Sequence, residues 1–255
     1  WGACGPPRQR AWWGRAGLIA KCSAGMRAIC GAIALATGLI IAATRSGSGK
    51  TVFTLGLLRA LAGRGLSVAP TKTGPDYIDT AILGHVAGRK AINLDPWAMG
   101  AARLVGLAAA HAADADLLLV EGVMGLFDGA ADGHGSTADL AATLGLPVVL
   151  VVDAERISQS IAPLVSGFAT WRADVRVAGV VLNRVGSPRH ELMLRRALEP
   201  TGIPVFGAMP RDKGLILPER HLGLVLPDEI ARFDEVVTRA AENIAAHVEI
   251  ETLLD

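Results

Sequence analysis

The sequence has few cysteines, and none after position 30. The three thiols are those of Cys4, Cys22 and Cys30. The rest of the chain therefore has no disulfide framework, no cysteine-ligated zinc site and no cysteine nucleophile. Its six histidines are scattered, and no pair has the spacing of metal ligands, so we expect them to be structural.

The chain also lacks a strong excess of either charge, with a formal net charge of +1 over 255 residues. The first thirty residues carry five basic side chains and no acidic one, whereas the rest carries 20 basic and 24 acidic side chains. A slightly acidic main part is not typical of nucleic-acid-binding proteins, which present basic surfaces. We therefore predict no nucleic-acid partner.

No apolar run is long enough to span a membrane. The uncharged run from 28 to 44 has 17 residues, short of the ~20 that a span needs. Basic residues before this run leave a signal peptide or anchor as an alternative. Because the second half of the run reads as a strand of the fold, we expect residues 1–32 to be a non-native or upstream-translated leader. We expect residues 33–255 to be the folded domain, with a cytoplasmic location and no membrane partner.

The most informative segment that is present is rich in glycine. A strand-like segment at 38–43 and a helix-like stretch at 52–64 flank a six-residue run: Ser46, Gly47, Ser48, Gly49, Lys50 and Thr51. In this context the backbone N–H groups and the helix N-terminus bind phosphate, the lysine reaches the β- and γ-phosphates, and the threonine hydroxyl ligates Mg²⁺. Thr44 replaces the first glycine of the usual pattern, and Gly47 supplies an extra one. The run predicts binding of a nucleoside triphosphate with Mg²⁺; an ordinary strand–turn–helix corner is the alternative.

Short apolar segments alternate with helical patterns along the chain. Further strands are expected at 66–70, 116–120, 147–152, 175–182 and 204–208, and helices at 79–86, 95–112, 137–144, 158–172, 189–198 and 228–247. This alternation indicates right-handed βαβ units and a parallel sheet that is covered on both faces. We predict an α/β fold with a doubly wound, mostly parallel sheet of the P-loop type. Because ligands bind beyond the carboxyl ends of such strands, polar residues there are the candidates for function.

Carboxylates occupy two of the predicted strand ends. Glu121 directly follows the third strand, where a nucleoside triphosphatase holds Mg²⁺; a helix N-cap or a solvated strand end is the alternative. Asp76 and Asp79 lie on a corner that Gly74 and Pro75 shape. We expect Asp76 to bring a second carboxylate to the metal. Asp79 is either catalytic or the N-cap of the helix that follows.

Three more side chains follow predicted strands. Lys72 would add positive charge near the γ-phosphate and an anionic substrate, or be a solvated surface lysine. Asn183 would contact an adenine edge through its amide, or occupy a plain turn. Arg45 is either solvated or contacts phosphate across a homodimer.

At these residues the sequence resembles the cobyrinate or hydrogenobyrinate a,c-diamide synthases of corrinoid biosynthesis, over residues 38–254. The resemblance is carried by the segments 46–51, 72–79, 93–97, 120–129, 180–185 and 220–224. The first of these is generic, whereas the second and fourth together are specific.

The resemblance implies a dethiobiotin-synthetase-like domain that acts as an ATP-dependent carbon–nitrogen ligase. Its reaction would be amidation of the a and c acetate carboxylates of a corrin ring through an acyl phosphate. The implied residues serve the nucleotide and Mg²⁺ (Lys50, Thr51, Asp76 and Glu121) or face the substrate carboxylate and the acyl phosphate (Lys72, Tyr77, Asp79 and Asp128), with Ile78 in the same substrate-binding segment.

Members of that family also carry a C-terminal glutaminase domain with a cysteine nucleophile. The chain ends at Asp255, about where that domain would begin, so we expect the ammonia to be free or to come from another domain or chain. The sequence leaves open whether the corrin contains cobalt. A P-loop switch ATPase of the septum-site or partition type is the alternative function, although the acidic segment 247–251 is unlike the tails such proteins need. A third alternative is a related enzyme such as dethiobiotin synthetase, which also phosphorylates a carboxylate. That enzyme lacks the motif that this chain has at 74–79.

Overall fold

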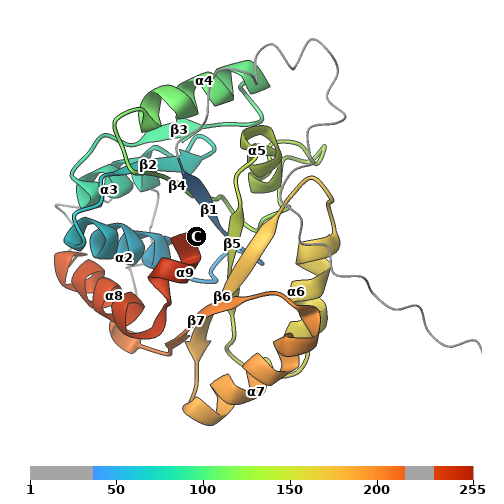
Figure 1. The fold of residues 1–255 in the computed structure, drawn as a ribbon. Coiled ribbons are helices and arrows are strands. Elements are labelled where there is room, and N and C mark those ends of the chain that lie inside the picture. Colours follow the sequence, from blue (N-terminus) through green and yellow to red (C-terminus); the bar gives the residue numbers. More distant parts are fainter. Residues whose placement is uncertain (1–36, 216–232, 255) are drawn as a thin grey trace, which may run out of the picture. The chain divides into compact units, whose positions relative to one another are not determined.

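The computed structural model describes residues 37–215 and 233–254, so the predicted leader at 1–32 and the segment 220–224 lie outside the described residues. A seven-stranded sheet in the order β3-β2-β4-β1-β5-β6-β7 forms the centre (Figure 1). Every pair of neighbouring strands is parallel. The strands are β1 (Gly38–Ala43), β2 (Val68–Thr73), β3 (Ile92–Leu94), β4 (Leu117–Glu121), β5 (Val148–Asp153), β6 (Val177–Val185) and β7 (Val205–Pro210). The predicted doubly wound α/β fold is confirmed.

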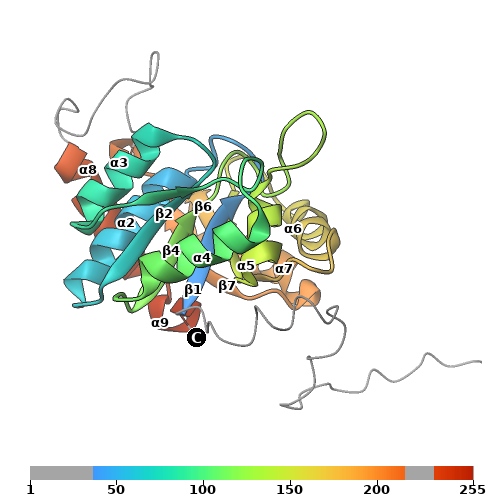
Figure 2. The ribbon, with the colours of Figure 1, turned by 90° about the horizontal axis from the view of Figure 1, so that it is seen from above.

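Helices cover both faces of the sheet (Figures 1 and 2). One face carries α2 (Lys50–Gly63), α3 (Tyr77–Ala87), α8 (Phe233–His247) and α9 (Ile250–Leu254). The other face carries α4 (Ala101–Ala112), α5 (Thr137–Leu144), α6 (Ile161–Thr170) and α7 (Pro188–Leu198). Within residues 37–215 and 233–254, no helix has both the length and the hydropathy that a membrane crossing needs.

The central strands send alternate side chains into two separate cores. Ile40 belongs to the core under α4 to α7, and Ile41 belongs to the core under α2, α3 and α8; both are 0% exposed. Because successive residues of a strand point to opposite faces, a strand that is covered on both sides must be apolar throughout. Each aliphatic side chain of this size contributes about 1.5–3 kcal/mol when fully buried. This burial explains why the central strands could be recognised from their uninterrupted apolar runs.

One strand was missed by the sequence predictions. β3 has three residues and directly precedes the helix that was predicted at 95–112, whereas α4 begins only at Ala101. Asp95 forms a turn at this point, since its Oδ1 accepts hydrogen bonds from the N–H groups of Trp97 and Ala98 at 2.9 and 3.3 Å. The prediction of helix from residue 95 is therefore wrong, because residues 96–98 form a separate turn and α4 begins only after its N-cap, Gly100.

The edge strand β7 is covered by the segment that follows α8. Gly207 and Val248 form an antiparallel bridge, and the N–H of Glu249 donates to the carbonyl of Phe206 at 2.8 Å. A Cβ at Gly207 would lie 2.4 Å from the carbonyl oxygen of His247, so glycine is required for this close approach. At the opposite edge the sheet ends in the short strand β3.

Candidate active site

The phosphate loop joins the end of β1 to the start of α2. Gly47 and Gly49 have φ angles of 76° and 89°, in the left-handed region that favours glycine. A Cβ at Gly49 would lie only 2.3 Å from Asn183 Nδ2. Because Gly49 is the N-cap of α2, no capping side chain occupies the first turn of that helix. The loop and helix therefore offer backbone N–H groups to an anion.

Asn183 lies within β6 and braces the phosphate loop. Its Nδ2 donates to the carbonyl of Ser48 at 2.8 Å, and its Oδ1 accepts from the N–H of Arg184 at 3.0 Å. Ser48 is 1% exposed, and its hydroxyl donates to the carbonyl of Arg45 at 3.0 Å. The alternative of a plain turn asparagine is wrong, because the residue is in a strand and holds the loop. Its contact with adenine stays a prediction.

Four polar side chains, one each from α2, β2, α3 and β4, meet beside the loop: Thr51, Lys72, Asp79 and Glu121. Thr51 Oγ1 donates to Glu121 Oε1 at 2.6 Å, and Lys72 Nζ donates to the same oxygen at 3.0 Å. Lys72 Nζ also forms an ion pair with Asp79 Oδ2 at 2.7 Å and donates to the carbonyl of Gly122 at 3.2 Å. We call Lys72, Asp79 and Glu121 the lysine cluster.

The lysine cluster is almost completely enclosed. The exposed fractions are 2% for Lys72, 6% for Asp79 and 0% for Glu121. The alternatives of a surface lysine at 72 and of a solvated carboxylate at 121 are therefore wrong. Glu121 is not a helix N-cap either, because it lies in β4 and its Oε1 bonds Thr51 and Lys72. Burial by itself would lower the pKa of Lys72, but the carboxylates of Glu121 and Asp79 raise it above its usual value. The lysine is thus held in its charged form.

Lys50 experiences the opposite balance. Burial lowers the pKa of Lys50, and the attraction of Glu121 opposes that shift without cancelling it. A partly desolvated ammonium group gains more from an anionic ligand than a fully hydrated one. This is the setting expected of a lysine that binds phosphate.

The two carboxylate oxygens of Glu121 differ in their hydrogen bonding. Among the described residues, Glu121 Oε2 is buried with no hydrogen-bond partner, which is unfavourable unless a cation or a donor meets it. A carboxylate oxygen and the Thr51 hydroxyl are ligands that Mg²⁺ accepts together with phosphate oxygens and water. Nowhere in the described part of the chain do three or more His, Cys, Asp or Glu side chains gather as a metal site. The residues therefore fit an Mg²⁺ ion that is held largely by a nucleotide.

At the corner after β2, Asp76 and Asp79 have different roles. Asp76 is the N-cap of α3, where its Oδ1 accepts from the N–H groups of Ile78 and Asp79, both at 3.0 Å. The alternative that Asp79 caps this helix is wrong, because Asp79 lies in the first turn and faces Lys72. Asn93 Nδ2 steadies the corner by donating to the carbonyls of Gly74 and Asp76 at 2.7 and 3.1 Å. Metal binding by Asp76 stays a prediction.

The three residues expected to bind substrate lie in different environments. Tyr77 is 63% exposed, and Asp128 is exposed with its Oδ2 accepting from the N–H of Gly125 at 2.8 Å. Both side chains are open to solvent, and their contact with a substrate stays a prediction. Ile78, by contrast, is 6% exposed and belongs to the core under α2 and α3. Its side chain packs in that core, and contact of Ile78 with a substrate stays a prediction.

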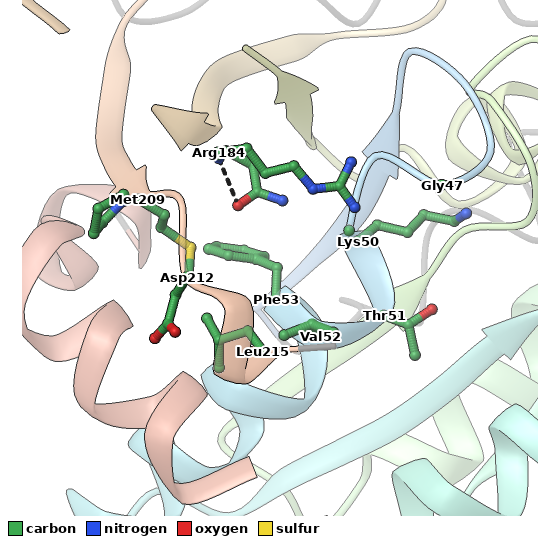
Figure 3. A pocket seen from close by; sticks show the side chains of 12 residues that line it. Gly47, Lys50, Thr51, Val52, Phe53, Arg184, Met209, Asp212 and Leu215 are labelled. Atoms are coloured by element: carbon green, nitrogen blue, oxygen red, sulfur yellow. Dashed lines mark hydrogen bonds between the residues drawn. The ribbon is translucent and has the colours of Figure 1, made fainter. Parts of the chain in front are cut away.

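A cavity of about 400 Å³ adjoins the phosphate loop. Its lining includes Lys50 and Thr51 together with three apolar side chains, those of Phe53, Met209 and Leu215 (Figure 3). An apolar pocket with a few polar groups suits a nucleotide base and sugar. The sequence predictions missed these apolar residues, since they are far apart along the chain and only the fold brings them together.

Asp153, at the carboxyl end of β5, holds two arginines. Its Oδ2 accepts from Arg45 Nη2 at 2.9 Å and from Arg184 Nη1 at 2.8 Å, while its Oδ1 accepts from the N–H of Glu155 at 3.0 Å. The Asp153 side chain is 4% exposed, whereas those of Arg45 and Arg184 are 69% and 38% exposed. We call these three residues the arginine group. Arg45 is thus exposed, as one alternative had it, but paired.

Comparison with known proteins also indicates a nucleotide-binding domain. A family model described as the CobQ/CobB/MinD/ParA nucleotide binding domain matches residues 39–225, a range that contains the phosphate loop and the lysine cluster. The chain belongs to this family. The prediction of a nucleotide-binding domain is thereby confirmed.

The chain is also similar to curated proteins named hydrogenobyrinate a,c-diamide synthase. It is 56% identical over 217 residues to the protein from Rhizobium meliloti (strain 1021) and 57% identical over 217 residues to that from Brucella suis biovar 1 (strain 1330). It is 52% identical over 221 residues to the protein from Rhodobacter capsulatus. Each match covers 85% of this chain but only 51%, 50% and 51% of the respective relative. The resemblance is confirmed, and the chain spans about half the length of the curated relatives it matches.

Among solved structures, the chain resembles chloroplast FtsY from Physcomitrella patens with a TM-score of 0.52. The match covers 80% of this chain and 65% of that chain, at 13% sequence identity. Similarity at this level supports the P-loop fold alone.

Proposed function

We propose that this domain uses Mg·ATP to amidate the a and c acetate carboxylates of a corrin ring. The observation that carries the proposal is the lysine cluster, a buried cation between two carboxylates, bonded to Thr51 of the phosphate loop. The choice of substrate is supported by relatives 52–57% identical that bear the name hydrogenobyrinate a,c-diamide synthase. Those names favour hydrogenobyrinate over its cobalt-containing counterpart.

The chemistry requires activation of a carboxylate, because oxide is too poor a leaving group for ammonia to displace. A carboxylate oxygen attacks the γ-phosphorus of ATP, the bond to the β-phosphate oxygen breaks, and ADP leaves with an acyl phosphate in place. Ammonia then attacks the carbonyl carbon, the C–N bond forms, inorganic phosphate departs and the nitrogen loses a proton. Positioning and charge neutralisation supply most of the rate enhancement in such transfers.

On the nucleotide side, the phosphate loop from Ser46 to Gly49 would surround the β-phosphate, and Lys50 would reach the β- and γ-phosphates. Thr51 Oγ1 and the Glu121 carboxylate would hold Mg²⁺, whose charge offsets that of the phosphates when it is bound. Asn183 keeps the loop in shape through its bond to Ser48. We propose ATP and Mg²⁺ as ligands because the phosphate loop, Lys50, Thr51 and Glu121 suit them chemically.

On the substrate side, Lys72 would supply a fixed positive charge next to the transferred phosphoryl group. Asp79 and Glu121 hold it charged and in place, so it need not reorganise during the reaction. Asp76 caps α3 and thereby sets Tyr77 at the first helical position, exposed toward solvent. Tyr77 and Asp128 are therefore the side chains that we assign to contact with the corrin acid.

The nitrogen source is proposed to be ammonia from solution or from a glutaminase domain or chain. No cysteine follows position 30, so a cysteine nucleophile for glutamine hydrolysis has to be supplied from elsewhere. A homodimer and a cytoplasmic location stay predictions.

The description of the family includes MinD and ParA, so membership alone does not separate a synthetase from a nucleotide-dependent switch. High identity to named synthases over 85% of the chain favours the synthetase.

The deciding experiment measures ADP release with Mg·ATP and ammonium chloride, with and without hydrogenobyrinate or cobyrinate, and identifies the product by mass. We expect sustained ADP release over many turnovers to require both the corrin acid and ammonium, with two amides formed per corrin. ATP hydrolysis that ignores the acid but accelerates with lipid vesicles or DNA would contradict the proposal and support the switch.

A further inference from the structure

The arginine group has an excess of positive charge. One carboxylate, that of Asp153, is shared between two guanidinium groups, each within 2.9 Å of the same oxygen atom. Each guanidinium has five N–H donors, so most of their donors remain available to an anion. The carboxylate itself is fixed, because it is 4% exposed and also accepts from the N–H of Glu155.

This excess charge lies at the nucleotide cavity. Arg184 lines the cavity together with Lys50 and Asn183, and Figure 3 shows its side chain extending from β6 toward the phosphate loop. Arg45 directly precedes Ser46 in the loop, and Asp153 joins it to Arg184. The extra positive charge is therefore next to the place where the phosphates of a nucleotide bind.

The backbone at Arg184 explains how the side chain comes to line the cavity. Its φ is 59°, a left-handed conformation that is unfavourable for a residue with a Cβ, and the pairing of β6 with β7 shifts register between Leu182 and Val185. In a regular strand, Asn183 and Arg184 would point to opposite faces of the sheet. Here both line one cavity. Unfavourable backbone of this kind concentrates at sites where the direction of a side chain matters.

We propose that Arg184, assisted by Arg45, is a second phosphate contact for the nucleotide, and that Asp153 is the positioning residue that holds both arginines at the loop. The inference rests on the proposed function, since it takes a nucleoside triphosphate as the ligand. Phosphate oxygens accept from the remaining N–H donors of Arg184, while Asp153 keeps its bond to Nη1. Two cations from different strands, Lys50 and Arg184, then face the same polyphosphate.

Calorimetric titration of the purified chain with AMP, ADP and ATP in the presence of Mg²⁺ tests this assignment. For Arg184→Ala, we expect the Kd for ATP to rise about tenfold, the size of a charge-assisted contact, and the Kd for AMP to change much less. Arg184→Lys keeps the charge and is expected to lose only about threefold. Arg45→Ala is expected to lose about threefold for ATP, because its side chain is the more exposed of the two.

The matched control is Arg211→Ala. Arg211 lies at the same edge of the sheet and pairs with Glu155 at 3.1 Å, but it is 59% exposed and lines a different cavity. Its Kd for ATP is expected to stay within about twofold of the wild-type value. Thermal unfolding of each variant establishes that it is folded.

The role of Asp153 is tested by Asp153→Asn, which preserves shape but removes the charge that holds the arginines. We expect a KM for ATP about threefold higher with kcat within about twofold, a split that a general loss of structure would not give. Tighter ATP binding in this variant would show that the carboxylate only competes with phosphate, and would overturn its positioning role.

Two results would overturn the assignment of Arg184. Unchanged ATP binding in Arg184→Ala would remove the contact altogether, and an equal loss for AMP and ATP would move it to the base, the sugar or the α-phosphate. Since AMP also carries the α-phosphate, an equal loss excludes a contact with the β- and γ-phosphates that Lys50 reaches. Either result leaves the proposed function intact, provided that the wild-type chain binds ATP. A wild-type chain that binds no nucleotide would instead overturn the proposed function itself.

Discussion

The lysine cluster and the arginine group lie at the same edge of one sheet, yet they are built in opposite ways. The lysine cluster joins one cation to two carboxylates and is at most 6% exposed at any of its residues. The arginine group joins two cations to one carboxylate, and its arginines are 69% and 38% exposed. One group thus has a net negative charge inside the protein, and the other has a net positive charge open to solvent.

The difference indicates what each group is suited to do. An enclosed group keeps its geometry through a reaction. Its surplus negative charge suits a metal cation, as does Glu121 Oε2, which has no hydrogen-bond partner within the described ranges. An open group can accept and release a ligand, and its surplus positive charge suits phosphate. A metal–nucleotide complex contains both a cation for the first group and phosphates for the second. The contrast predicts that changes in the lysine cluster harm folding and chemistry, whereas changes in exposed ion pairs have small effects on stability.

The largest expected effect is that of Lys72→Met on stability. The substitution leaves Asp79 and Glu121 buried without their shared cation, so we expect the free energy of unfolding to fall by about 3–5 kcal/mol. Urea denaturation measures it. The control is Arg64→Met, which breaks the exposed ion pair with Glu251 and should cost no more than about 1 kcal/mol. Equal losses in the two variants would remove the distinction between enclosed and open groups.

The next largest effect is that of Glu121→Gln on activity. The amide keeps the shape of the side chain but removes the negative charge that faces Thr51, Lys72 and the proposed Mg²⁺, so we expect ATP-dependent amide formation to fall about a hundredfold to a thousandfold. Steady-state ADP release with saturating corrin acid measures this. Glu155→Gln, in the exposed pair with Arg211, should stay within about twofold. A fully active Glu121→Gln variant would exclude this carboxylate from the chemistry.

A glycine pair sharpens the comparison at the phosphate loop itself. Gly49→Ala forces a Cβ into a left-handed backbone and toward Asn183 Nδ2, so we expect a loss of about 1–3 kcal/mol in the free energy of unfolding together with weaker ATP binding. Gly63→Ala, near the end of the same helix, meets no atom within 4 Å and should stabilise the protein by about 0.5–1 kcal/mol. Thermal unfolding and calorimetry on both variants would show whether the two glycines differ in this way.

The smallest effect concerns a half-buried ion pair away from the site. Asp139 belongs to the capping box of α5, and Arg172 donates to its carboxylate. Partial burial by itself would raise the pKa of Asp139, but the bonds from Arg172 and Ser136 together outweigh it and lower the pKa below its usual value near 3.8. The stabilisation is therefore present above pH 3.8 and disappears as the pH falls through the lower folded value.

Arg172→Ala should accordingly cost about 0.5 kcal/mol or less at pH 7, because solvent screens the pair. The difference from the wild type should shrink as the pH falls below 3.8 and through the lower folded pKa of Asp139, as measured by urea denaturation across that range. A difference that did not shrink with falling pH would show that Arg172 contributes by packing and not through the charges of Asp139 and Asp174.

The sequence predicted well what is local or buried on both sides. The phosphate loop is contiguous, and β1, β4 and β5 are uninterrupted apolar runs because helices cover both of their faces. The rule that parallel strands end at one edge was enough to bring Thr51 and Glu121 together. The strand β3 was not predicted, because three residues are too few to show the periodicity of a strand.

Other features depended on geometry that leaves no signal in the residue types. The position at which α3 begins decides that Asp76 caps the helix and that Asp79 faces Lys72. A start one turn later would make Asp79 the cap, and an aspartate suits both roles. The left-handed backbone at Arg184 has no marker in the sequence, because glycine or asparagine is usual there and arginine is not. The apolar wall of the cavity joins α2 to β7 and the turn after it, a meeting that only the assembled sheet defines.

The bridge between Gly207 and Val248 has a consequence for the behaviour of the protein in concentrated solution. A parallel sheet normally exposes unpaired N–H and C=O groups along its outermost strands, and these can recruit strands from other molecules. Here the backbone after α8 occupies the groups of β7 near Gly207, and the opposite margin offers only three residues. Substituting Gly207 would push that backbone away, and the variant should then aggregate more readily than the parent chain.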